Sequence, residues 1–118
     1  MGEAMAYSWD DLAALSLARQ FPKVAGRGAA AVAQTVARIG PIQAQTARSP
    51  FLGLAARIPG VRLEDICAAY DELLIVRGSN IRGTVHTCTP PDHALLEAAT
   101  RIGQRALWAR MLKLKATT

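Results

Sequence analysis

Apolar residues recur at helical spacing over much of the chain, and the first such stretch predicts a helix over about residues 9–21. Ser8 and Asp11 have the spacing of a capping box, which satisfies the free amides at a helix start. Pro22 ends this stretch. The predicted apolar face of this helix consists of Trp9, Leu12, Ala13, Leu17 and Phe21.

Two further helices follow, and each has recognisable end signals. The alanine-rich segment 28–39 has high helix propensity and is followed by Gly40, a residue typical of helix C-termini. Ser49 is predicted as the N-cap of a short third helix, with Pro50 at its first position and an end near Ile58.

A fourth helix is predicted from apolar residues that recur at helical spacing, after which the pattern changes to that of strands. The helical positions are Leu63, Ile66, Cys67, Tyr70 and Leu74. The β-branched runs 74–78 and 83–88 are then separated by the polar segment 79–82, which predicts a β-hairpin.

The last predicted helix runs from Pro90 to about Lys113, after Thr89 as its N-cap. Several helices followed by a basic hairpin and a long final helix are typical of a mainly α winged helix-turn-helix domain, with the hairpin as its wing. We therefore predict a single winged-helix domain over residues 1–118. Other mostly helical folds with a small hairpin also fit the pattern.

Composition refines this picture through charge. The 118 residues are 51% hydrophobic and 19% charged, which is the composition of a globular domain rather than a disordered chain. Fourteen Lys and Arg residues against nine Asp and Glu residues give a net charge of +5, and eleven of the fourteen are Arg. Guanidinium groups suit phosphate oxygens, so a polyanionic partner is one interpretation. Simple solubility is the other.

Several classes of site are disfavoured. Cys67 and Cys88 have no metal-ligand spacing and are predicted to be reduced core residues of a cytoplasmic protein. The N-terminus lacks the features of an export signal, and no apolar run is long enough for a membrane span. His86 and His93 lack the further ligands of a zinc site, and no glycine-rich phosphate loop is present, so we predict no metal and no cofactor.

The polar segment 40–50, between the second and third helices, is the most distinctive part of the chain. Gln43 and Gln45 are spaced so that an extended or turn backbone can send both amides to the same side. An amide cannot abstract a proton, but its carbonyl can orient a water and its NH₂ can hold a substrate oxygen. Such groups suffice when the leaving group is already activated, as in an N7-alkylated guanine. The alternative is that both glutamines only cap neighbouring helix ends.

A family resemblance adds to this interpretation. The relevant segments, in chain order, are Ser8-Trp-Asp-Asp11, Leu17-Ala-Arg-Gln20, Ile39-Gly-Pro-Ile-Gln-Ala-Gln-Thr-Ala-Arg-Ser-Pro50, Leu54-Ala-Ala-Arg-Ile58, Leu63-Glu-Asp-Ile66, Ile75-Val-Arg77, Arg82-Gly-Thr-Val-His86 and Pro91-Asp92. Together they resemble the bacterial winged-helix DNA glycosylases of the AlkZ/YcaQ type, over about residues 8 to 95.

The resemblance implies tandem winged-helix units around a DNA channel and excision of bulky N-alkylated purines, including the unhooking of interstrand crosslinks. The Gln-aliphatic-Gln catalytic motif of that family falls on Gln43, Ala44 and Gln45, which would position the water and the sugar. Its Arg-Gly-Thr-x-His hairpin signature falls on residues 82–86. Double-stranded DNA is the implied partner.

Five residues are candidate DNA contacts, namely Arg48, Arg77, Arg82, Thr84 and His86. For the arginines the alternative is a solvated surface, and for His86 it is a buried, hydrogen-bonded side chain. His93, in the first turn of a helix, is expected to be exposed to solvent.

Members of the family are several times longer than one winged-helix unit, so this chain is either an N-terminal portion or a reduced relative, and we do not expect activity from it alone. Trp108, Met111 and Leu112 on the last helix would pack on further units or support a homodimer. A non-enzymatic DNA-binding regulator remains the main alternative function, and an interaction fragment is another.

Overall fold

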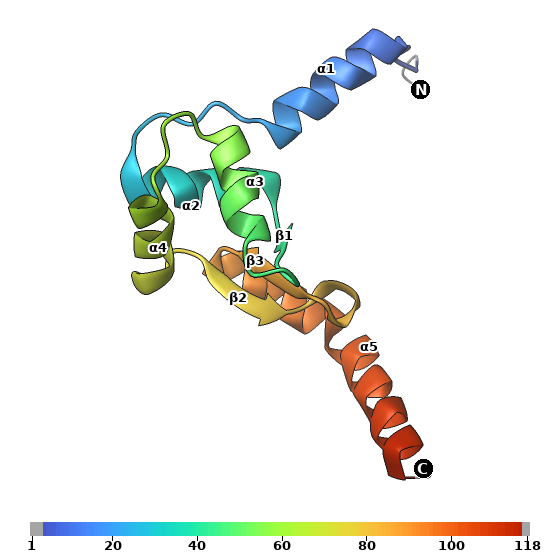
Figure 1. Ribbon diagram of the computed structural model, residues 1–118. Helices are drawn as coiled ribbons and strands as arrows, with labels where there is room; N and C mark the ends of the chain where they lie inside the picture. The colour runs from blue at the N-terminus through green and yellow to red at the C-terminus, as the bar shows by residue number, and fades with distance from the viewer. Residues whose placement is uncertain (1–3, 117–118) are drawn as a thin grey trace.

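The computed structural model describes residues 4–116, which form five α-helices and a small three-stranded sheet (Figure 1). The elements are α1 (Trp9–Gln20), α2 (Gly28–Ile39), β1 (Ile42–Gln43), α3 (Ser49–Arg57), α4 (Leu63–Asp71), β2 (Val76–Ser79), the 3₁₀ turn η1 (Ile81–Gly83), β3 (Val85–Cys88) and α5 (Pro90–Ala116).

The ends of the predicted domain, residues 1–3 and 117–118, lie outside the described residues, as does part of the N-terminus predicted to lack an export signal. No helix within the described stretch combines the length and apolarity that a membrane span requires.

The predicted mainly helical fold with a β-hairpin is confirmed, and the helix boundaries agree within a few residues. β2 and β3 pair antiparallel as expected. The third helix begins at Ser49 rather than after it, and Arg48 is its N-cap. A third strand, β1, was not predicted; it pairs with the other side of β3, giving the order β1-β3-β2. Two residues are too few to show strand alternation, so this segment was expected to be only a turn.

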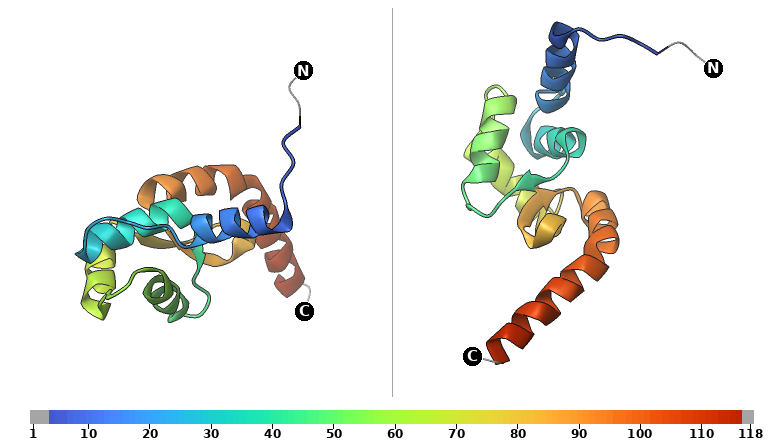
Figure 2. Two further views of the ribbon diagram at one scale, coloured as in Figure 1. Left: turned by 90° about the horizontal axis from the view of Figure 1, so that it is seen from above. Right: turned by 90° about the vertical axis from the view of Figure 1, so that its right-hand side faces the viewer.

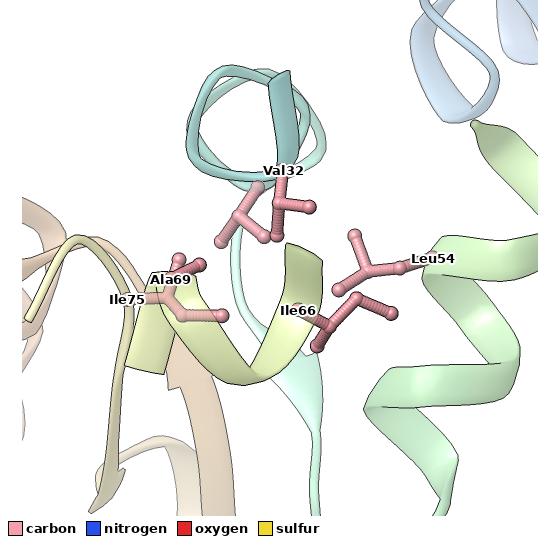
Figure 3. Packing of buried hydrophobic residues seen from close by; sticks show 6 residues of the cluster. Val32, Leu54, Ile66, Ala69 and Ile75 are labelled. Atoms are coloured by element: carbon pink, nitrogen blue, oxygen red, sulfur yellow. The ribbon is translucent and has the colours of Figure 1, made fainter. Parts of the chain in front are cut away.

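The core lies between α2, α3, α4 and the start of the hairpin (Figure 3). Its buried members are Val32, Val36, Leu54, Ile66, Ala69 and Ile75, each at most 2% exposed. Burial of each larger aliphatic side chain stabilises the fold by about 1.5–3 kcal/mol. This cluster holds α2 and α3 together, and thereby fixes both ends of the segment that carries the two glutamines.

Two positions predicted for the apolar face of α4 are exposed instead. Leu63 is 63% exposed because it stands in the first turn, and Cys67 follows buried Ile66 by one position, about 100° around the helix. The expectation that Cys67 is a core residue is therefore wrong. Cys88 is buried as predicted, and this burial raises the pKa of its thiol, with a smaller effect from the charge of Asp92.

α1 stands away from the body of the molecule (Figure 1), and none of its residues is buried. Its predicted apolar face is therefore exposed, with Trp9 at 87%. The predicted capping box is present, since the Asp11 amide donates to Ser8 Oγ at 3.0 Å and the Ser8 amide to Asp11 Oδ2 at 2.9 Å. Arg57 of α3 holds the end of α1: its Nε donates to the Gln20 carbonyl at 2.6 Å and its guanidinium lies 4.8 Å from the Phe21 ring centroid.

α5 packs on the hairpin in its first half and extends away from it in its second half (Figure 2). Gln104 marks the change, because its Nε2 donates to the Asn80 carbonyl at 2.7 Å. Beyond it, Trp108, Met111 and Leu112 are 53%, 43% and 65% exposed. The predicted homodimer through this surface remains a prediction.

Candidate functional site

Gln43 lies on β1, directly opposite His86 of β3. Directly opposed residues of an antiparallel pair place their side chains on the same face of the sheet. The Gln43 side chain is exposed and has no hydrogen-bond partner among residues 4–116. Its carbonyl oxygen and its NH₂ group are therefore both available to a ligand.

Gln45 is held differently, although it is only two residues away. The Ala44 amide donates to the Val85 carbonyl at 2.7 Å, which continues the ladder by one residue. The Val85 amide donates at 2.7 Å to Oε1 of the Gln45 side chain. A main-chain carbonyl would accept this bond in a regular ladder. Ala44, between the two glutamines, is 4% exposed.

His86 is buried, as one of the two interpretations expected, with 8% exposure. Its Nδ1 lies 3.0 Å from the Thr84 carbonyl oxygen, which can only accept, so Nδ1 carries the proton. In the neutral ring, Nε2 is then an acceptor. The proposed contact of His86 with DNA remains a prediction.

The tip of the hairpin exposes Arg82 in a left-handed conformation with φ 56°. Gly83 follows with φ 72°, a conformation that glycine adopts without strain. Thr84 Oγ1 donates to the Ile81 carbonyl at 2.9 Å. Within the Arg-Gly-Thr-x-His segment, threonine and histidine thus bond inside the hairpin while the arginine side chain projects from it.

Arg77 and Arg48 border a hollow beside the segment that carries the glutamines. Arg77 Nη2 donates to the Ala47 carbonyl at 3.0 Å, and its guanidinium lies 5.2 Å from the Tyr70 ring centroid. The hollow, of about 400 Å³, is lined by Ala47, Arg48, Phe51, Leu52, Leu63 and Arg77. Both arginines are exposed, so the apolar hollow has a positively charged rim.

Sequence reasoning missed the polar contacts between the hairpin and α5. The prediction that His93 is exposed is wrong: it is half-buried, with Nδ1 3.2 Å from Nδ2 of fully buried Asn80. Its ring lies over Gly78, where a Cβ would overlap it. Asn80 follows a strand and carries a polar side chain, and its burial depends on His93 of α5 and on Cys88 of β3, whose Sγ lies 4.0 Å from Asn80 Nδ2.

Titratable side chains do not gather at this site. Among the described residues, no group of three or more His, Cys, Asp or Glu residues could hold a metal ion. A hollow of about 750 Å³ between the start of α2 and the α3–α4 connection contains none of the predicted site residues. The chemistry that the site offers is that of amides, imidazole and guanidinium groups.

Comparison with known families gives a match over residues 36–118 to the family described as DNA glycosylase AlkZ-like. The comparisons with curated proteins and with solved structures give no match. The matched segment covers well over half of the 118 residues and includes both glutamines and all five predicted DNA contacts. The chain therefore belongs to the AlkZ-like DNA glycosylase family.

Proposed function

We propose that this chain is a DNA-binding winged-helix unit of a DNA glycosylase that excises bulky N-alkylated purines or unhooks interstrand crosslinks. In this proposal residues 1–118 form one domain, the N-terminal unit of a longer tandem architecture. The helices α2, α3 and α4 followed by the β2–β3 hairpin support the winged-helix assignment. The observation that carries the proposed function is the exposure of Gln43 and Gln45 where β1 ends beside the hairpin.

The proposed reaction needs no strong acid or base from the protein. Alkylation at N7 makes the purine ring cationic before it binds. When the bond from C1′ to N9 breaks, its electron pair stays on the base and neutralises that charge. Water oxygen then bonds to C1′ and its proton passes to solvent. Positioned amides lower the barrier by orienting this water and the sugar.

The exposed arginines supply the proposed contacts with the DNA backbone. Arg48 and Arg77 border the apolar hollow, and Arg82 projects from the hairpin tip. Guanidinium groups bind phosphate oxygens with two donors at a time. The excess of arginine over acidic residues agrees with such a surface.

Binding to a fluorescent duplex, measured by anisotropy at several salt concentrations, tests the proposal. We expect affinity to fall steeply with salt, because phosphate contacts release counterions. Arg82→Ala should weaken binding and reduce the salt slope by about 0.9, the value for one lost contact. Arg27→Ala changes the same charge at the other end of the body, beside the start of α2, and should have little effect. Salt-independent or absent binding would contradict the proposal.

Release of N7-methylguanine from a modified duplex tests the chemistry. We expect the chain alone to leave release at the spontaneous rate, because the rest of the DNA channel is needed. If the chain releases the base faster than the spontaneous rate, and Gln43→Ala abolishes this release, the expected inactivity is wrong and the chain itself carries out the reaction. A non-enzymatic regulator would instead bind duplex without release, with an affinity that Gln43→Ala leaves unchanged.

A further inference from the structure

We infer that the two glutamines have different roles: Gln45 is a positioning residue that acts through Val85, and Gln43 is the amide that meets the water. The inference rests on the proposed function and assigns a separate role to each of the two glutamines of the motif. It follows from the hydrogen bond between Val85 N and Gln45 Oε1.

This bond completes the end of a very short strand. β1 has two residues, and beyond them only the Ala44 amide continues the main-chain ladder to Val85. The chain bends at Gln45, so a side-chain oxygen takes the place of the next main-chain acceptor. Gln45 thus lets the backbone leave the sheet while the Val85 amide stays bonded. Because so few hydrogen bonds join β1 to β3, each of them helps to fix the position of Gln43.

The same bond limits what Gln45 can offer to a substrate. One of the two lone pairs of its carbonyl oxygen is engaged at 2.7 Å, and its NH₂ group can only donate. A water that attacks C1′ needs an acceptor for one of its hydrogens, so that an oxygen lone pair faces the sugar. Gln43 has a carbonyl oxygen without a partner in the described part of the chain. It therefore has the group that the water requires.

Amide hydrogen exchange measured by NMR tests the role of Gln45 without requiring activity. In Gln45→Ala the Val85 amide should exchange about three- to tenfold faster, the effect of one lost hydrogen bond. In Gln45→Glu a carboxylate oxygen can accept the same bond, so exchange should stay within about twofold of the unchanged chain. Gln34→Ala, an exposed glutamine on α2, is the matched control and should leave Val85 unchanged. Unchanged Val85 exchange in Gln45→Ala would overturn the inference.

A DNA titration of the same variants tests whether Gln45 positions Gln43. The Gln43 side-chain NH₂ resonances should shift on saturation with duplex DNA, and Gln45→Glu should preserve this shift while Gln45→Ala diminishes it. Saturation compensates for the weaker affinity that an added negative charge causes. If Gln45→Glu loses the shift as Gln45→Ala does, although Val85 remains protected, the NH₂ group of Gln45 is the essential one and the inference fails.

Failure of the proposed function would look different. If duplex DNA leaves the Gln43 resonances of the unchanged chain in place, the proposed function fails, and the positioning of Gln43 for DNA fails with it. The exchange of the Val85 amide still decides, by itself, whether Gln45 holds the end of the ladder.

Discussion

The packed body and the two end helices use similar apolar residues with opposite results. Leu54 in the body is fully buried, whereas Trp9 on α1 is 87% exposed and Leu112 on α5 is 65% exposed. The body brings three helices and a hairpin onto one cluster, while α1 and the second half of α5 extend from it on their own (Figures 1 and 2). An apolar pattern therefore shows which side chains favour burial, but not whether the chain itself can cover them.

The two regions also differ in what stabilises them. Hydrophobic burial holds the body together. α1 depends on its capping box and on the contacts of Arg57 with its last turn. The end helices should thus respond strongly to local changes and weakly to changes in the core.

The largest expected effect is on the body. Leu54→Ala removes a fully buried side chain and should lower the free energy of unfolding by about 2–5 kcal/mol. Leu52→Ala, on the same helix but 70% exposed, should change it by no more than about 0.5 kcal/mol. Urea unfolding followed by circular dichroism measures both. Equal effects would show that the two leucines do not differ in burial as described.

Glycine substitutions should show the next largest contrast. Gly78→Ala places a Cβ against the His93 ring and should destabilise the body by about 1–3 kcal/mol. Gly103→Ala meets nothing within 4 Å on α5 and should stabilise that helix by about 0.5–1 kcal/mol. Thermal unfolding compares the two, and a stabilising Gly78→Ala would contradict the close packing of α5 on the sheet.

A measurement of self-association tests whether a second copy of the chain covers the exposed end of α5. Sedimentation velocity should show a dimer fraction that grows with concentration, because Trp108 and Leu112 are exposed on one side of the helix. The double change Trp108→Ser and Leu112→Ser should shift the chain to monomer, whereas Arg110→Ser nearby should not. A chain that is monomeric at every concentration would disprove the homodimer.

The smallest expected effect concerns pH. Hydrogen bonds from the Ser8 amide, and then from its side chain, lower the pKa of Asp11 below its usual 3.8, and the Arg62 amide does the same for Asp65 at α4. A lowered folded-state pKa adds stability above the unfolded pKa, and this stability is lost as pH falls through the folded value. Below about pH 4, α1 should fray before the packed α4, as NMR chemical shifts can show. Asp11→Asn should remove the pH dependence of α1.

Local signals in the sequence were sufficient for most of the fold. Gly40 and the alanine-rich run gave the bounds of α2, and the change to β-branched residues after Leu74 gave the hairpin. What could not be predicted depends on distant partners. The bond from Val85 to Gln45 spans forty residues, and the burial of His93 depends on Gly78 and Asn80. No pattern near either residue encodes these contacts.

The most direct test of the account is an NMR titration of the chain with duplex DNA, following the side-chain NH₂ resonances of its glutamines. We predict that the Gln43 resonances shift strongly and that the shift weakens with salt, while those of Gln34, exposed on α2, stay in place. Shifts confined to Gln34, or equal at both residues, would contradict the claim that the end of β1 faces the DNA.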